Sequence, residues 1–447
     1  MHFEKVKNIK IINKKVRVCN LLVKDNENFF VNNILTHNCS GKCQYCFAYT
    51  QKSNNPAVKN DNFKVKSINV DKLIGIFEGK EPENPYYKFF IKKKKILHIG
   101  GLADNFCNFE RKNMIGYPLI EYLLKTGYPT IISTKFIFLN IPKYKAIFEK
   151  YKDTAKMAIQ ASIITGEEDL AKEIEVGIPK VKDRINQLTE LKKMGYYTIL
   201  RLRPFLIGVS DVKLEEFLDS CSDSVDSIST EFYCLDFRAT PEDKKRYEWM
   251  SKICGFDIMN YYNKLSPTTR GTYKRLNRNV KEKYVKIMYK WAKDNGINFA
   301  CSDPDFKELN FSASCCGLPN DWGTLKNQLT NVLRLARMKN CQKVDKEKPT
   351  LIYLKDVIQD KDEEEWKSEH KFMGDEVCKT SINTSELSRI NHSYLFKKKW
   401  NNPNNINSPY MYFDGKMKPY GVDKEGNVIY EYIESPYEKK WQKEGLL

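Results

Sequence analysis

Three cysteines stand close together in THNCSGKCQYCFAYT, residues 36–50, as Cys39, Cys43 and Cys46. Where thiols stay reduced, cysteines clustered on one short loop are typical metal ligands or redox groups. Zinc is one alternative, but a zinc site needs a fourth ligand at suitable spacing. His37 is the only close candidate for that ligand in the sequence. The spacing therefore predicts a metal centre built mainly from these three thiolates.

With Tyr45 before its last cysteine, the loop resembles the CxxxCxΦC loop of radical SAM enzymes. The resemblance implies that the three thiolates bind three irons of a [4Fe–4S] cluster and leave the fourth iron for S-adenosylmethionine (SAM). It also implies that one electron, from a reductant such as flavodoxin or ferredoxin, cleaves SAM to methionine and a 5′-deoxyadenosyl radical. That radical abstracts hydrogen from the substrate, while the protein supplies orientation and excludes water.

Segments downstream of the loop extend the resemblance to the spore photoproduct lyase-like branch of the radical SAM superfamily. They read GGLADNFCNFE, ISTK, QASIIT, IEVGIPKVKDRINQLTELKKMGY and LRPFLIG, and the resemblance spans about residues 39–300. It implies that two glycines approach the amino group of SAM, that a lysine and a serine bind its carboxylate or ribose, and that an arginine lies nearby. These residues are Gly100, Gly101, Lys135, Ser162 and Arg203.

Two acidic residues, Glu110 and Glu175, match recurring positions of that branch, and the resemblance gives neither a fixed role. Ordinary structural roles are the alternative for this group of residues. Lys135 would then be a surface lysine at a strand end, and Glu175 would form a helix-anchoring salt bridge with Arg184. The sequence alone leaves both interpretations open.

The residues before Cys39 predict a different chemistry. Residues 16–38, VRVCNLLVKDNENFFVNNILTHN, place two apolar runs around a polar turn, which indicates a strand–turn–strand hairpin. The hairpin and the His-Asn-Cys at its end resemble the C-terminal end of inteins, the self-excising domains of the Hint fold. The resemblance implies that Asn38 cyclises and cuts the chain after itself with help from His37. The Cys39 thiol would accept the upstream segment as a thioester.

A whole intein is far longer than residues 1–38, so the resemblance implies the C-terminal half of a split intein. A separately encoded polypeptide would carry the N-terminal half, and trans-splicing would join its segment directly to Cys39. Cys39 would thus be a splicing nucleophile first and an iron ligand afterwards. We expect the joined segment to supply the first strand of the barrel. Glu27 stands where many inteins have a histidine, which leaves the proton-transfer steps open.

Apolar, β-branched runs alternate with amphipathic stretches between residues 94 and 303. The predicted strands lie within 94–106, 128–135, 156–165, 196–208, 227–236 and 297–303, and the clearest predicted helices are 181–195 and 280–296. This alternation is typical of parallel α/β folds. We predict a partial parallel (β/α) barrel of the radical SAM type, with its chemistry at the C-terminal ends of the strands. The predicted domains are an all-β Hint-type fragment (1–38), the partial barrel (39–310) and a mixed α+β module (311–447).

Three further cysteines occur in CSDPDFKELNFSASCC, residues 301–316. Cys301, Cys315 and Cys316 are candidates for hydrogen-atom donation, a role that a thiol has in the lyase branch. They are also candidates for ligating an auxiliary cluster or zinc. Buried thiols without a chemical role are the alternative.

The pattern changes beyond residue 320. It predicts an amphipathic helix over 324–338, a charged helix over 359–371, and β-hairpins over 390–432, where basic and aromatic residues are interspersed. Such side chains can stack on bases and bind phosphates, so we predict a substrate-recognition module. An ordinary small β-rich cap is the alternative.

The composition, with 41% hydrophobic and 30% charged residues among 447, is that of a soluble globular protein. No apolar run of about 18 residues and no apolar signal core are present, so we expect no membrane span and a cytoplasmic location. The net charge of +18 favours a polyanionic partner such as DNA or RNA, although lysine-rich, solvated helix faces explain it equally well.

Together these features predict a radical SAM enzyme that is made as a trans-splicing precursor and acts on nucleic acid, in lesion repair or base modification. One alternative is a radical SAM enzyme that modifies a peptide or protein with the help of an auxiliary cluster. Another is a metal-binding protein without enzymatic activity that keeps an intein relic.

Overall fold

A computed structural model of the chain describes most of the predicted barrel and much of the C-terminal module. The described residues are 41–46, 69–80, 91, 94, 96–101, 104–237, 241–268, 273–310, 314–319, 322, 329–345, 347–357, 393–405 and 408–447. The predicted intein segment with His37, Asn38 and Cys39, and the predicted charged helix over 359–371, lie outside them.

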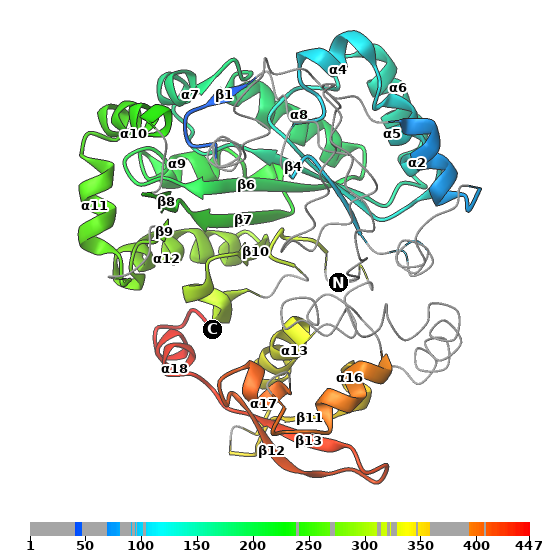
Figure 1. The fold of residues 1–447 in the computed structure, drawn as a ribbon, viewed down its shortest axis with the longest axis vertical. Coiled ribbons are helices and arrows are strands. Elements are labelled where there is room, and N and C mark those ends of the chain that lie inside the picture. The colour runs from blue at the N-terminus through cyan, green and yellow to red at the C-terminus, as the bar shows by residue number, and fades with distance from the viewer. Residues whose placement is uncertain are drawn as a thin grey trace, which may run out of the picture.

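Six parallel strands form the main sheet, in the order β10–β7–β6–β4–β3–β2 (Figure 1). They are β2 (Leu97–Ile99), β3 (Thr130–Thr134), β4 (Met157–Ser162), β6 (Tyr197–Phe205), β7 (Ser227–Phe232) and β10 (Asn298–Cys301). Each lies within one of the predicted strand segments, and at least one helix separates each strand from the next along the chain. The α/β class is therefore confirmed.

Helices occupy the crossovers between these strands, as Figure 1 shows. They are α4 (Asn108–Asn113), α5 (Tyr117–Thr126), α6 (Pro142–Lys150), α7 (Glu168–Ile174), α8 (Val181–Lys193), α9 (Leu214–Asp219), α10 (Pro241–Cys254), α11 (Ile258–Leu265) and α12 (Arg278–Asp294), and α2 (Val70–Phe77) precedes the sheet. Local sequence fixes their ends in several cases. The Asn277 side chain, for example, accepts a hydrogen bond from the Val280 backbone N–H and caps α12.

Short elements complete this half of the molecule. They are β1 (Lys42–Cys43), β5 (Glu175–Val176), β8 (Leu235–Asp236), β9 (Tyr273–Lys274), η1 (Ser222–Ser224) and η2 (Pro304–Leu309). β1 pairs with β5 outside the main sheet, and β8 pairs with β9.

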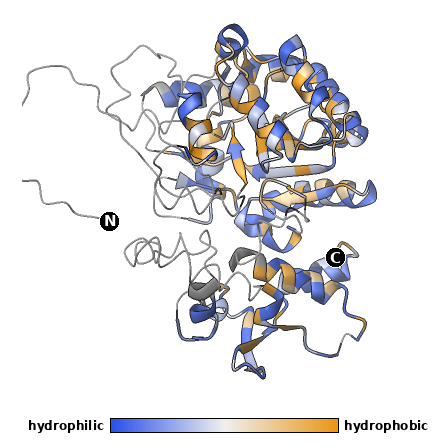
Figure 2. Cartoon of the chain, turned by 90° about the vertical axis from the view of Figure 1, so that its right-hand side faces the viewer, coloured by the Kyte–Doolittle hydropathy of each residue, from blue (hydrophilic) through white to orange (hydrophobic). Residues whose placement is uncertain are grey.

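The two faces of the main sheet differ in character. The face toward the helices is apolar, with Ile159, Leu200 and Ile228 fully buried in the large core (Figure 2). On the opposite face, the amino-terminal part of the sheet is also apolar, and Leu318 and Trp322 pack on it. Toward the carboxyl ends of the strands this second face turns polar. Because parallel sheets place their chemistry at that edge, the polar layer is the natural position for an active site.

The C-terminal module has a hydrophobic core of its own, which includes Trp400 and Tyr430. Its elements are α13 (Leu329–Cys341), β11 (Leu351–Ile352), α14 (Leu354–Val357), α16 (Ser393–Trp400), α17 (Pro409–Tyr412), β12 (Met417–Val422) and β13 (Val428–Tyr432). The β12–β13 hairpin confirms one predicted hairpin. The stretch before it forms helices rather than the predicted strands, because its apolar residues do not alternate and Trp400 is instead buried from a helix.

The last helix, α18 (Pro436–Lys443), contacts both the sheet domain and the module. Trp441 is fully buried in the large core and its indole N–H donates to Glu308 at 2.9 Å. Arg337 of α13 forms a 2.8 Å ion pair with Glu438 and donates to the Lys307 carbonyl at 2.6 Å. The chain therefore crosses between the two cores more than once after residue 310.

Among the helices that the structure describes, none has both the length and the apolar character needed to span a bilayer.

Candidate active site

Main-chain contacts hold the cysteine loop in place. β1 pairs antiparallel with β5, which sets Cys43 opposite Glu175, and the Gln44 N–H donates to the Ile174 carbonyl at 2.9 Å. From α10, the Arg246 guanidinium donates to the carbonyls of Gln44 and Cys46, the latter at 3.1 Å. Segments about 130 and 200 residues away in sequence thus fix the loop on both sides.

A buried charge network lies beneath this loop. The Glu175 carboxylate forms ion pairs with Arg184 at 2.7 Å and with Lys135 at 2.6 Å, and it accepts a hydrogen bond from the Tyr45 hydroxyl. The salt bridge between Glu175 and Arg184 is the structural role that the sequence offered as the alternative for Glu175. Burial alone would raise the pKa of Glu175, but Arg184 and Lys135 lower this pKa to about 2. The carboxylate therefore stays ionised and ties helix α8, strand β3 and the cysteine loop together.

Lys135 is a buried connector rather than a surface lysine, with 16% of its side chain exposed. Its ammonium also donates to the Tyr45 hydroxyl at 2.6 Å and to the Ser162 carbonyl at 3.4 Å. Arg184 donates to that same carbonyl at 2.7 Å. Lys135 and Ser162, both predicted to bind SAM, are thereby brought together beside the cysteine loop.

The described thiols of the loop fit a thiolate-bound cluster. Cys43 is buried in the large apolar core, and Cys46 is half-buried against it. An apolar shell of this kind limits solvent access to a cluster and tunes its potential. Within the described part of the chain no three His, Cys, Asp or Glu residues are placed to hold a metal ion. Cys39, the predicted third ligand, stands two residues before Gly41 and also lies outside the described residues.

The strand register aligns the other predicted cofactor residues. Ser162 of β4 is level with Arg201 of β6, which is level with Ser229 of β7. Arg203 follows two residues later on the same face and forms an ion pair with Glu231. Burial opposes the charge on Arg203, but Glu231 outweighs it and raises the pKa of the guanidinium. The carboxyl edge of the sheet thus carries a continuous row of polar groups.

Gly100 is required by the close approach of its neighbouring strand. Its φ is +87°, and a Cβ at this position would lie 2.0 Å from the Ser133 carbonyl oxygen. Its lack of a side chain is therefore explained by strand packing, whether or not a ligand also approaches. Gly101 follows it at the end of β2 and is partly exposed.

Side chains from β4, from β7 and from the residue after β10 hold the Cys315–Cys316 pair on the polar face. The Cys315 carbonyl accepts hydrogen bonds from the hydroxyls of Ser229 at 3.0 Å and Ser302 at 3.1 Å. The Cys316 carbonyl accepts from the Gln160 amide at 3.1 Å. The hydrogen bond between the two thiols is the first cause that raises the pKa of the Cys315 thiol, followed by the charge of Cys316 and by burial. Cys315 therefore keeps its proton at neutral pH.

Cys301 lies apart from that pair. It is the last residue of β10, it is 1% exposed, and it packs in the large core between the sheet and the helices. Because successive side chains of a strand point to opposite faces, Ala300, which is level with Ser229, faces the polar side instead. Burial raises the pKa of the Cys301 thiol above its usual range. The structure thus brings two of the three candidate cysteines together and separates the third.

Two buried acids beside the site have structural contacts. Glu110 accepts two hydrogen bonds from the Gly116 N–H, both 2.9 Å, and one from the Tyr144 hydroxyl at 2.7 Å. Asp104 accepts from the Thr134 hydroxyl at 2.8 Å and from the Lys135 N–H at 2.5 Å. Glu110 thus caps the start of α5, and Asp104 fixes the loop that carries Lys135.

His98 should make the stability of the sheet pH-dependent. Its Nε2 lies 2.8 Å from the Ser133 hydroxyl, and burial, followed by Arg201 and Arg203, lowers the pKa of its imidazole to about 3. Between pH 3 and about 6.5 the unfolded chain therefore binds the extra proton, and stability falls as the pH falls, by up to ~1.4 kcal/mol per pH unit. We expect urea unfolding to show a larger loss of stability between pH 7.5 and pH 5 in the unmodified chain than in His98→Gln, by up to about 2 kcal/mol. Equal losses in the two proteins would show that His98 does not cause this pH dependence.

No known protein-family model matches this sequence, and no curated protein matches it either. Among solved structures, spore photoproduct lyase complexed with dinucleoside spore photoproduct has 12% identity and a TM-score of 0.40, over 58% of this chain and 73% of that one. SuiB of Streptococcus suis bound to precursor peptide SuiA has 13% identity and a TM-score of 0.36, over 61% of this chain and 48% of that one. The functional case therefore rests on the residues of this chain.

Proposed function

We propose that the chain is a radical SAM enzyme whose cluster is held by Cys39, Cys43 and Cys46. The observation that carries this proposal is the fixed position of residues 41–46, which include Cys43 and Cys46, over the Lys135–Glu175 network at the carboxyl edge of a parallel sheet. The spacing of the cysteines supports a [4Fe–4S] cluster with one open iron. When bound, the cluster and SAM supply one-electron chemistry and a 5′-deoxyadenosyl radical.

In this proposal, residues of the chain bind and orient the cluster and SAM. Glu175, Arg184 and Tyr45 hold the loop, and their burial keeps water from it. The predicted SAM contacts at Gly100, Gly101, Lys135, Ser162 and Arg203 are a proposal that their positions on one edge of the sheet support. The Cys315–Cys316 pair is the proposed hydrogen-atom donor, since both residues lie on the polar face.

We further propose that the chain is the C-terminal precursor of a trans-splicing pair. Splicing would remove residues 1–38 and join the partner's segment to Cys39. Among the described strands, β2 pairs only with β3, so a first strand from the partner would add at the free side of β2.

Co-production with a polypeptide that carries the matching N-terminal intein half tests the splicing proposal. We expect a ligated product that lacks residues 1–38, seen by mass spectrometry, and no such product from Asn38→Ala or Cys39→Ala. The spliced protein, reduced without oxygen, should convert SAM to 5′-deoxyadenosine. Full SAM cleavage by the unspliced chain would refute the need for splicing, and no cleavage after splicing would favour the metal-binding protein with an intein relic.

Nucleic acid is the proposed substrate, for lesion repair or base modification, because the net charge of +18 suits a polyanion. The alternative substrate is a peptide or protein, with an auxiliary cluster. Iron counting separates the two in part: about four irons per chain fit one cluster, and about eight fit the alternative.

A further inference from the structure

One cation of the polar face has no counter-ion among the described residues. Arg201 and Arg203 lie two residues apart on β6 and face the same side of the sheet. Glu231 pairs with Arg203, but no described carboxylate forms an ion pair with Arg201. The Nε of Arg201 is buried and has no hydrogen-bond partner there, and its terminal nitrogen makes only a long contact of 3.5 Å with the Gln160 amide oxygen.

Such a guanidinium is costly unless something binds it. A buried donor without a partner loses its hydration, and an unpaired buried charge is penalised further. Arg201 as a whole is half-buried, and burial followed by Arg203 lowers the pKa of its guanidinium to about 10. The neighbouring His98, with its pKa near 3, stays neutral and adds no second repulsive charge. These features describe a site that is completed by an oxyanion.

The position of Arg201 favours an anion of the substrate over the carboxylate of SAM. The cysteine loop contacts Lys135 after β3, and β4 separates β3 from β6 in the sheet. The proposed SAM contact on β6, Arg203, lies two residues nearer the carboxyl end of the strand than Arg201. Gln160 instead links Arg201 to the other candidate group, because its amide oxygen faces Arg201 and its amide nitrogen donates to the Cys316 carbonyl at 3.1 Å. An anion on Arg201 would therefore lie beside the Cys315–Cys316 pair.

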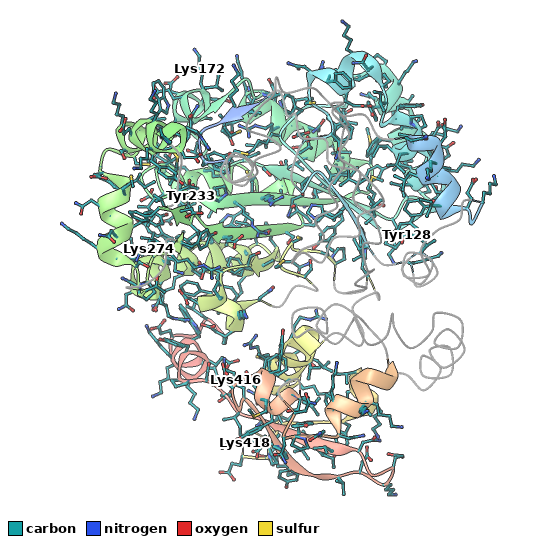
Figure 3. All side chains as sticks on the ribbon, viewed as in Figure 1. Tyr128, Lys172, Tyr233, Lys274, Lys416 and Lys418 are labelled. Carbon is teal, nitrogen blue, oxygen red and sulfur yellow. The ribbon has the colours of Figure 1, made fainter. Side chains whose placement is uncertain are left out.

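A second group of cations favours phosphate over a peptide carboxylate. Lys307, Arg275 and Lys416 gather where the C-terminal module meets the sheet domain, beside Asp414 and the Glu438-paired Arg337. Burial followed by Lys416 lowers the pKa of Lys307. Figure 3 shows Lys416 on the side of the module nearer the sheet domain, with Lys418 farther along β12. This junction thus offers a polyanion a second set of cations besides Arg201.

We propose that Arg201 binds a phosphodiester oxyanion of the substrate and so holds the substrate next to the Cys315–Cys316 pair. The proposal rests on the proposed function for the role of the thiols. The phosphate contact itself needs neither cluster nor SAM, so the phosphate site and the radical SAM function can be refuted independently.

The test measures binding of a fluorescein-labelled, single-stranded DNA of ten nucleotides to the full chain by fluorescence anisotropy. Arg201→Gln should weaken binding by at least about 10-fold, because charge-assisted hydrogen bonds to the phosphate are lost. Arg201→Lys should lose less, since it keeps a charge without the forked donors. The matched control is Arg111→Gln on α4, where the guanidinium contacts the Ile137 carbonyl at 2.9 Å and the Asn140 side chain. It removes the same charge from an exposed position and should change affinity by less than about 2-fold.

The proposal would be overturned if the unmodified chain did not bind the oligonucleotide, or if Arg201→Gln and Arg111→Gln weakened its binding equally. It would also be overturned if Arg201→Gln weakened only the binding of a labelled ten-residue acidic peptide or of SAM, and left the binding of the oligonucleotide unchanged. Circular dichroism and the thermal midpoint show whether Arg201→Gln is folded. If it is not folded, Arg201→Lys provides the test. An unchanged affinity of the folded Arg201→Lys variant for the oligonucleotide would contradict recognition of the phosphate by the forked N–H donors of the guanidinium.

Discussion

Replacing Glu175 with Gln should unfold the chain at lower denaturant and strip iron from its cysteine loop. The substitution keeps the shape of the side chain but leaves Arg184 and Lys135 as unpaired buried cations. Removing one member of a buried ion pair typically costs about 3–5 kcal/mol, much of it the desolvation of the charge that remains. Urea unfolding should show a loss of this size.

The loss of iron follows from the second contact of Glu175. Its carboxylate accepts the Tyr45 hydroxyl between Cys43 and Cys46, so the loop loses an anchor together with the charge. After anaerobic reconstitution we expect well under half of the about four irons per chain that one cluster contains. Tyr45→Phe keeps the ring and removes only the hydroxyl, so it should lower iron content with a smaller loss of stability.

A surface ion pair provides the matched control. Glu190 pairs with Lys145 at 2.6 Å, with 40% of the Glu190 side chain exposed. Glu190→Gln removes the same group where water replaces the lost contact, so it should cost no more than about 1 kcal/mol and leave the iron content unchanged. Similar results for Glu175→Gln and Glu190→Gln would show that the buried network does not hold the cysteine loop.

The strands and the cysteine loop were predictable because both depend on local sequence. β3 and β4 are short runs of buried residues, a pattern that parallel strands produce when both faces are covered. The contacts that position the loop were not predictable, since Tyr45 lies 90 residues from Lys135 and 130 from Glu175. Only the Glu175–Arg184 pair, nine positions apart, was close enough in sequence to be considered.

Side-chain direction was harder to predict than the strands themselves. A shift of one residue reverses the face that a strand residue occupies, so the sequence could place Cys301 at a strand end without showing that it faces the core. The helix α16 was missed for a related reason. In the structure Trp400 packs from this helix against Tyr430, a contact between residues 30 positions apart that the local pattern of residues does not reveal.

Because Cys301 and the Cys315–Cys316 pair lie on opposite faces of the sheet, a deuterium-transfer experiment should distinguish between them. In D2O the thiol hydrogens of the folded protein exchange for deuterium. Within the proposed function, a thiol beside the cofactor would donate that deuterium atom to the 5′-deoxyadenosyl group in the absence of substrate. The thiol would become a thiyl radical, and the product 5′-deoxyadenosine would carry one deuterium. Cys315 is suited to this step because its raised pKa keeps the sulfur protonated at neutral pH.

We therefore expect mass spectrometry to show a several-fold smaller fraction of deuterated 5′-deoxyadenosine from a Cys315→Ala/Cys316→Ala variant of the spliced protein. Cys301→Ala is the matched control, and it should leave that fraction unchanged because Cys301 is 1% exposed and lies in the core on the other side of the sheet. Comparable iron contents in all three proteins would show that the cluster is intact. A fraction that falls in Cys301→Ala, or that persists in the double variant, would mean that the hydrogen atom comes from elsewhere and that the Cys315–Cys316 pair is only a packed segment of the polar face.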